Sequence, residues 1–271
     1  FALLLISIFV LAKKLFTSTA VALLSVFFFL FNGSLSFIRF FTLHPISLNT
    51  LRDVIAAREF PAFAPWGPGD VTAFWNLNVY TNQRHLAFAF ALVILFILTC
   101  LQVERFSLKR QMSWAIFWGI IIGLLPYFHQ PTLLILAIVI ATYMLFFPKL
   151  RIFLFITGIL ASLLVVPQLL AVRGSSNPIE WYPGYIIHNE LSVRRLLSFW
   201  WQNLGLHSIL ILVGSFFLPR RAKLALIPII PLFIIPNLFK FSVEVSANHK
   251  FFNFAMLLGQ IISANTIVQI Y

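Results

Sequence analysis

The chain has 271 residues, of which 61% are hydrophobic and only 10% are charged. Because a soluble domain of this length has about 25% charged residues, the composition excludes a soluble globular protein and indicates a polytopic membrane protein. The net charge of +12 would favour nucleic-acid binding in a soluble protein, but in a membrane protein it bears on orientation, and we expect no nucleic-acid partner.

Apolar runs recur along the whole chain. A helix needs about 20 mainly apolar residues to cross the hydrocarbon core. Nine runs fit when tilt and truncation are allowed: 1–12, 15–31, 85–102, 112–126, 132–147, 152–172, 206–218, 224–238 and 252–271. They predict an all-α fold, a polytopic transmembrane helical bundle of about nine spans in a single domain over 1–271. Because the chain begins and ends inside apolar runs, we expect a fragment truncated at both ends.

The connectors between the runs alternate in charge. Short basic connectors recur at Lys13–Lys14, 103–111, 148–151 and 219–223. The positive-inside rule places such connectors in the cytoplasm. All acidic residues except Glu104 then fall on the other side, together with two long loops at 32–84 and 173–205. The pattern therefore predicts an integral membrane protein with its long loops outside the cytoplasm.

Each long loop contains a segment that predicts a short surface helix. Residues 49–60 place Leu51, Val54 and Ile55 on one apolar stripe. Residues 191–205 combine basic side chains with an aromatic belt. Both segments are typical of helices that lie in the membrane interface.

Polar residues gather in four clusters on the outer side of this topology. The clusters are NQRH at 82–85, His129 with Gln130 in a tight link, Glu180, Trp181 and Tyr182 with Arg194 and Arg195 in the second loop, and SVEVSANHKFFNF at 242–254. Ionisable groups at membrane depth are costly and tend to mark sites. Each cluster also has a plain structural interpretation, as an interfacial anchor, a helix end or a headgroup contact.

The residue types in these clusters suit phosphate binding. Arg84 offers a planar fork of donors that matches phosphate oxygens, and His85 adds another donor. Asp70 follows a Pro/Gly-rich segment at 63–69 and is either a turn stabiliser or an acid with a chemical role. The sequence has no P-loop, dinucleotide fingerprint or zinc-ligand spacing.

The long outer loops, NQRHLAF at 82–88 and NHKFFNF at 248–254 together resemble the GT-C class of membrane glycosyltransferases, in particular bacterial membrane proteins of that type. Enzymes of this class transfer a sugar from a polyprenyl-phosphate donor to a lipid, glycan or protein acceptor at the outer face of the membrane. The resemblance implies a bacterial plasma membrane location, a polyprenyl-phosphate-linked sugar as substrate and membrane lipids as surroundings. It leaves a divalent cation open as a cofactor.

The resemblance also implies roles for individual residues. The expected substrate-binding residues are Arg84, His85, His129, Glu180, Trp181, Glu244, His249 and Lys250. Cations and neutral donors would hold the leaving phosphate where charge develops. Glu244 would orient a neighbouring cation or bind sugar hydroxyls, and Trp181 would stack on a sugar ring.

The sequence departs from the class in its acidic residues. An inverting transfer needs a carboxylate base, which in this class usually lies in an Asp/Glu pair of the first outer loop. No such pair occurs here, so the main catalytic acid either lies in a missing N-terminal segment, which we favour, or is Asp70 or another outer carboxylate.

Four other functions compete with this interpretation. A lipid-linked glycan polymerase, a flippase or another multi-span transporter would also combine many spans with polar outer loops. A transporter places polar residues near mid-membrane, whereas the apolar runs here are mostly clean and the polar groups concentrate at one surface. A non-catalytic scaffold would not need polar clusters that converge on one face.

Overall fold

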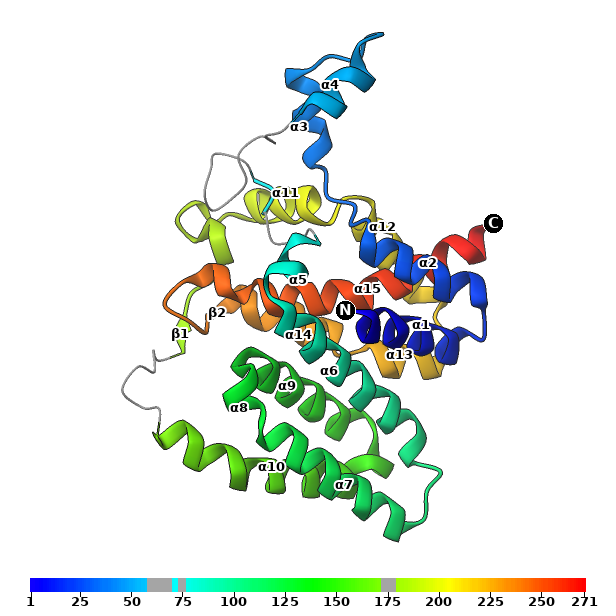
Figure 1. Ribbon diagram of the computed structural model, residues 1–271, viewed down its shortest axis with the longest axis vertical. Coiled ribbons are helices and arrows are strands. Elements are labelled where there is room, and N and C mark those ends of the chain that lie inside the picture. The colour runs from blue at the N-terminus through cyan, green and yellow to red at the C-terminus, as the bar shows by residue number, and fades with distance from the viewer. Residues whose placement is uncertain (58–69, 73–76, 172–178) are drawn as a thin grey trace.

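The computed structural model of the protein describes residues 1–57, 70–72, 77–171 and 179–271 (Figure 1). Within these ranges it describes every side chain except those of Arg39, Asn78, Thr81 and Arg84. The predicted segments 58–60 and 63–69 lie outside the described residues.

Helices make up nearly all of the described chain, which confirms the predicted all-α fold. The α-helices are α1 (Ala2–Phe16), α2 (Thr19–Leu30), α3 (Ser36–Leu43), α4 (Thr50–Ala56), α5 (Asn78–Asn82), α6 (Arg84–Val103), α7 (Leu108–Gly123), α8 (Leu125–Phe128), α9 (Gln130–Phe146), α10 (Arg151–Ala171), α11 (Val193–Leu204), α12 (Leu206–Phe217), α13 (Arg220–Leu226), α14 (Ile229–Leu238) and α15 (His249–Ile270). Short 3-10 helices are η2 (Pro148–Leu150), η4 (Tyr185–Glu190) and η5 (Val245–Asn248). Two short strands, β1 (Glu180–Trp181) and β2 (Phe239–Lys240), pair antiparallel.

The predicted count of nine spans is not confirmed. Among the described residues, five stretches are long and apolar enough to cross a membrane: His85–Val103, Leu108–Phe128, Pro148–Ala171, Arg220–Leu238 and Val245–Ile270. The pair α11 and α12, bent by 93°, would make a sixth if it is one broken span. Helices α2 and α9 are apolar but have only 12 and 17 residues. The difference arises because a span needs an unbroken helix of sufficient length, which an apolar run alone does not guarantee.

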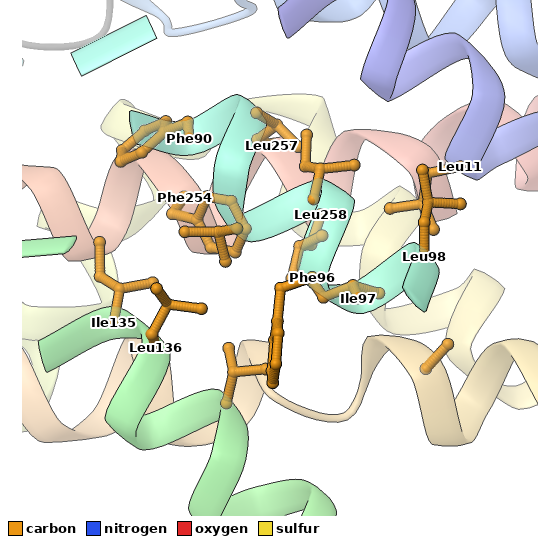
Figure 2. Close-up of a cluster of buried hydrophobic side chains, with 14 of the residues drawn as sticks. Leu11, Phe90, Phe96, Ile97, Leu98, Ile135, Leu136, Phe254, Leu257 and Leu258 are labelled. Carbon is orange, nitrogen blue, oxygen red and sulfur yellow. The ribbon is translucent and has the colours of Figure 1, made fainter. Parts of the chain in front are cut away.

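Helix α15 forms the centre of the bundle. It is buried along most of its length and packs against α2, α12 and α14. Figure 2 shows its Phe254 facing Phe90 of α6, with ring centroids 5.1 Å apart, beside Leu257 and Leu258. Between membrane helices such packing is stabilised by dispersion contacts rather than by the exclusion of water. The tight core therefore fixes the position of the first turn of α6 relative to the first turn of α15.

Helices α7 and α10 form a second close pair at one side of the bundle (Figure 1). Gly119 and Gly123 lie one turn apart on α7, and a Cβ atom added to either would meet Leu160 or Leu164 of α10 at about 2.6 Å. The glycines thus let the two backbones approach closely, as small residues do between membrane helices.

The short basic connectors meet at one end of the bundle. Lys14 lies within electrostatic range of Arg105 and Arg221, and the Arg221 guanidinium donates a hydrogen bond to Leu101 O at 3.1 Å. The α1–α2 and α6–α7 links lie on the right in Figure 1, whereas α8 and β2 lie on the left. This grouping agrees with the alternation of the connectors; the assignment of the basic end to the cytoplasm stays a prediction.

The second long loop packs onto the outer end of α15. Tyr185, Phe199 and Trp200 form a small buried cluster with Phe252 and Met256 of α15. Each of the two segments that predict surface helices contains a helix, α4 in the first and α11 in the second. Helix α3 was not predicted, and α3 and α4 stand away from the bundle in Figure 1. The loop over α15 therefore forms a second layer on its outer end.

Candidate functional site

Four of the predicted site residues come together at the ends of three helices, on the side that the sequence predicts to lie outside the cytoplasm. His85 lies in the first turn of α6, His129 directly precedes α9, and His249 and Lys250 begin α15. The His85 and His129 rings have centroids 5.0 Å apart. His129 also lies within electrostatic range of His249 and Lys250. We call these four residues the outer basic cluster.

His129 is the buried member from the middle of the chain. Its backbone is extended at the N-cap position of α9, and Pro131 in the first turn favours the start of a helix there. The ring Nδ1 lies 2.6 Å from Thr132 Oγ1, a hydroxyl that can donate or accept, so both neutral tautomers are compatible with this bond. Burial, together with the positive charges of Lys250, His85 and His249, lowers the pKa of His129 to about 3. His129 is therefore neutral at pH 7.

His249 is oriented by a backbone carbonyl. Its Nδ1 lies 2.8 Å from Ser246 O, and because a carbonyl only accepts, Nδ1 must carry the hydrogen. The Tyr185 hydroxyl donates to the same oxygen at 3.1 Å. Tyr185 has the unusual φ of 55° and follows Gly184 at 97°, a tight turn that directs its ring into the protein. The second loop thus helps to position the start of α15.

Buried polar atoms around the cluster lack partners. Among the described residues, Gln83 Oε1, His129 Nε2 and Asn253 Nδ2 are buried without a hydrogen bond. Gln83 precedes α6 by one residue, and Asn253 lies one turn after His249 on the same face of α15. Buried polar atoms are normally paired, so unpaired ones next to cationic side chains are consistent with a site for a polar ligand.

Asp70, the proposed catalytic candidate, is bound to α11. Its carboxylate accepts from Arg195 at 2.6 Å and from Gln202 at 3.0 Å. Asn203 of α11 holds the same segment, because its side chain bonds both Asp70 O and Thr72 N. The side chain of Asp70 is 27% exposed. This arrangement secures the segment 70–72 to the second loop, and the catalytic role of Asp70 stays a prediction.

Glu180 and Trp181 lie in the strand pair. Glu180 forms an ion pair with Lys240 at 2.8 Å, and Trp181 packs its ring on Phe239 while staying 60% exposed. Glu244 is exposed and accepts a hydrogen bond from the Ser246 hydroxyl at 3.3 Å. The ion pair of Glu180 and the hydrogen bond of Glu244 therefore join these residues to β2 and η5.

Arg84 is the first residue of α6, next to His85 in sequence, but its side chain lies outside the described residues. The described residues contain no group of three His, Cys, Asp or Glu side chains arranged to hold a metal ion. The role of Arg84 therefore stays a prediction. The resemblance still leaves a divalent cation open as a cofactor.

Two neighbours of the cluster were not among the expected site residues. Asn253 stands within the stretch 242–254, and its spacing of four from His249 is the signal that places both on one helix face. Tyr185 has no such signal, because its bond to Ser246 O joins segments 61 residues apart.

In comparison with known proteins, the chain matches no protein-family model, no curated protein and no solved structure. A functional conclusion therefore depends on the chemistry of the residues themselves.

Proposed function

We propose that the protein is a membrane glycosyltransferase that moves a sugar from a polyprenyl-phosphate donor to an acceptor at the outer face of the membrane. The observation that carries the proposal is the meeting of His85, His129, His249 and Lys250 at the ends of three helices. In the described residues no carboxylate lies within ion-pair distance of Lys250. A cation that is not neutralised by the protein suits a ligand that brings its own negative charge.

The proposed chemistry divides between two kinds of residue. As the bond between sugar and phosphate breaks, negative charge grows on the leaving phosphate, and Lys250 with a ring N–H of His85 or His129 would stabilise it. A carboxylate must take the proton of the acceptor hydroxyl. Asp70, Glu244 and the other carboxylates predicted to lie outside the cytoplasm are the candidates for that base.

Lys250→Ala tests the phosphate role. We expect the release of polyprenyl phosphate from a polyprenyl-phosphate hexose to fall by about 100-fold, because one donor to the developing charge is lost. Arg84→Ala should also reduce release. Arg194→Ala removes an exposed cation of α11 outside the cluster and is the matched control. Normal turnover in both Lys250→Ala and Arg84→Ala, at normal protein levels, would contradict the proposal.

A flippase or transporter is the second candidate, and the interior of α15 favours it. Gln260 and Asn265 are buried in this central helix, and each has a side-chain atom without a partner among the described residues. Polar groups at membrane depth are costly and mark pathways in transporters. The two functions differ in their products, since only a transferase forms a new glycosidic bond.

Gln260→Leu distinguishes them. For the transferase we expect sugar transfer in detergent to persist, because Gln260 lies about three turns along α15 from His249. Loss of lipid translocation in vesicles, with no glycosylated product formed by the unaltered protein, would instead establish the transporter.

A further inference from the structure

A charged cleft lies at the end of the bundle opposite the outer basic cluster. It has a volume of about 650 Å³ and lies where the α6–α7 link, η2 and the start of α13 meet. Its charged lining consists of Glu104, Arg105, Lys149, Arg220 and Arg221. We call this hollow the basic cleft; its volume is in the range of sites that bind small molecules.

Among the described residues, the cations of the basic cleft outnumber its carboxylates. Four cations line it against the single carboxylate of Glu104, and within the described ranges none of these cations forms an ion pair. Lys14 adds a further charge within electrostatic range of Arg105 and Arg221. Arg221 is partly engaged by Leu101 O, which fixes its guanidinium at the cleft wall. Such a site favours an anion with several oxygen acceptors, such as a phosphate.

An apolar groove lies next to the basic cleft along the side of the bundle. It has a volume of about 520 Å³ and runs between α9 and α13–α14, from Phe146 to Phe241. Phe146 lines both the cleft and the groove. Leu145 and Ile230, in the groove wall, are 71% and 57% exposed. A charged hollow that shares a wall residue with an apolar groove matches a molecule with an anionic head and a hydrocarbon tail.

The general preference for basic residues on the cytoplasmic side does not by itself explain this arrangement. Lys109, Arg110 and Lys223 satisfy that preference without lining the cleft. Arg110 stacks over the Phe106 ring at 4.0 Å, and Lys223 donates to Phe216 O at 3.2 Å. The cleft differs because its cations converge from three connectors on one hollow, which shares Phe146 with the apolar groove.

We propose that an anionic phospholipid binds here, with its phosphate in the basic cleft and an acyl chain in the groove between α9 and α14. Basic pockets between membrane helices on the cytoplasmic side suit such headgroups. The site is separate from the outer basic cluster, because α6 alone, with 20 residues between the two ends, is about 30 Å long. It would tie the arrangement of α6, α9 and α13 to the lipid composition of one leaflet.

The test compares lipids on the purified protein in neutral detergent, with bound lipid counted by native mass spectrometry and the melting temperature recorded in parallel. The probes are phosphatidylglycerol, phosphatidylcholine and inorganic phosphate. We expect phosphatidylglycerol to bind and to raise the melting temperature, and the other two to do so far less. Equal effects of phosphatidylcholine would overturn the anionic site, and equal effects of inorganic phosphate would overturn the lipid in favour of a free phosphate.

The headgroup contact is tested with two matched triple variants. Arg105→Gln/Lys149→Gln/Arg220→Gln removes three cleft cations, and Lys109→Gln/Arg110→Gln/Lys223→Gln removes three cations at the same end outside the cleft. We expect the first to bind phosphatidylglycerol about tenfold or more weakly and the second to bind it normally. An equal loss in both would show general surface attraction and overturn the site. If the first variant does not fold, Arg220→Gln alone is measured against Lys223→Gln with the same two outcomes.

The acyl-chain contact is tested separately. Ala141→Phe fills the groove at an exposed position of α9, and Leu212→Phe enlarges an exposed apolar side chain of α12 outside it. We expect only Ala141→Phe to weaken phosphatidylglycerol binding, by several-fold. Unchanged binding in Ala141→Phe would remove the groove from the proposal.

Discussion

The surroundings of His129 set its charge, and the charge of His129 affects stability. The ring is buried beside Lys250, His85 and His249, so the folded protein holds it neutral. The Lys250 ammonium among these groups provides the positive charge that the proposed phosphate would meet. His129, which the sequence alone presents as a helix end, thus lies among groups whose charges act on it.

This leads to a pH dependence with a definite sign. In the unfolded chain His129 takes up a proton near its ordinary pKa of 6.5, whereas in the folded protein its pKa is about 3. The unfolded state therefore binds more protons in that window, and the contribution of His129 to stability is lost as the pH falls through it. We expect the melting temperature of His129→Gln to fall less steeply with acid than that of the unaltered protein. His44→Gln, which removes an exposed histidine outside the cluster, should keep the original slope.

The ion pair between Asp70 and Arg195 makes another residue-scale prediction. Each partner is partly exposed, so breaking the pair should cost about 1 kcal/mol of unfolding free energy. We expect Asp70→Asn and Arg195→Gln to lower the melting temperature by similar amounts in thermal unfolding, with similar effects on sugar transfer. Abolition of transfer by Asp70→Asn alone would instead assign the catalytic base to Asp70.

At the scale of elements, close helix contacts decide which neighbours are possible. The pair α7 and α10 approaches at Gly119 and Gly123, where side chains of α10 occupy the space that a larger residue would need. Trp118 on α7 donates to Thr99 Oγ1 of α6 at 3.1 Å, which joins the pair to the central bundle. Without the glycines, α7 could not lie at its present distance from α10.

Two alanine substitutions test this contact. At Gly119 an added Cβ would lie 2.6 Å from Leu160 Cβ, so Gly119→Ala should lower the unfolding free energy by about 1–3 kcal/mol. Gly158 of α10 has no atom within 4 Å of such a Cβ, so Gly158→Ala should be neutral or stabilising by up to about 1 kcal/mol. Thermal unfolding in detergent compares the two, and equal effects would contradict the close approach.

At the scale of the whole molecule, the two ends of the bundle contain different groups of residues. The outer basic cluster and the strand pair lie at one end, and the basic cleft lies at the other. The proposed transfer needs the first end outside the cytoplasm, whereas the proposed phospholipid belongs to the leaflet at the second. Both the proposed sugar transfer and the proposed phospholipid binding therefore depend on which end of the bundle faces the cytoplasm.

Cysteine labelling tests the orientation. Cys100 is buried, so a Cys100→Ala background gives a protein without other cysteines. Val243→Cys places a thiol at an exposed position next to Glu244, and Lys109→Cys places one at an exposed position of the basic end. We expect a membrane-impermeant maleimide to label only Val243→Cys in intact cells and both after permeabilisation. Labelling of Lys109→Cys in intact cells would reverse the topology.

Much of the fold follows from sequence alone, because helix formation and membrane partition depend on local composition. The apolar runs became helices, and the short connectors with Lys13, Arg105, Lys149 and Arg220 alternate with the outer loops. The number of spans did not follow, since α2 and α9, with 12 and 17 residues, are not among the helices long enough to cross a membrane.

The sequence by itself determined which residue types stand at which helix ends, and therefore that His85, His129 and His249 belong to one side. Only the tertiary structure decided that these three meet at Lys250, that Asp70 lies against α11, and that Glu180 pairs with Lys240. Only the tertiary structure, likewise, showed that Phe146 lines both the basic cleft and the apolar groove. The physical reason is that side-chain periodicity is a property of one helix. Contacts between side chains of different helices depend on how the glycine contacts and the aromatic core around Phe90 and Phe254 pack the helices together.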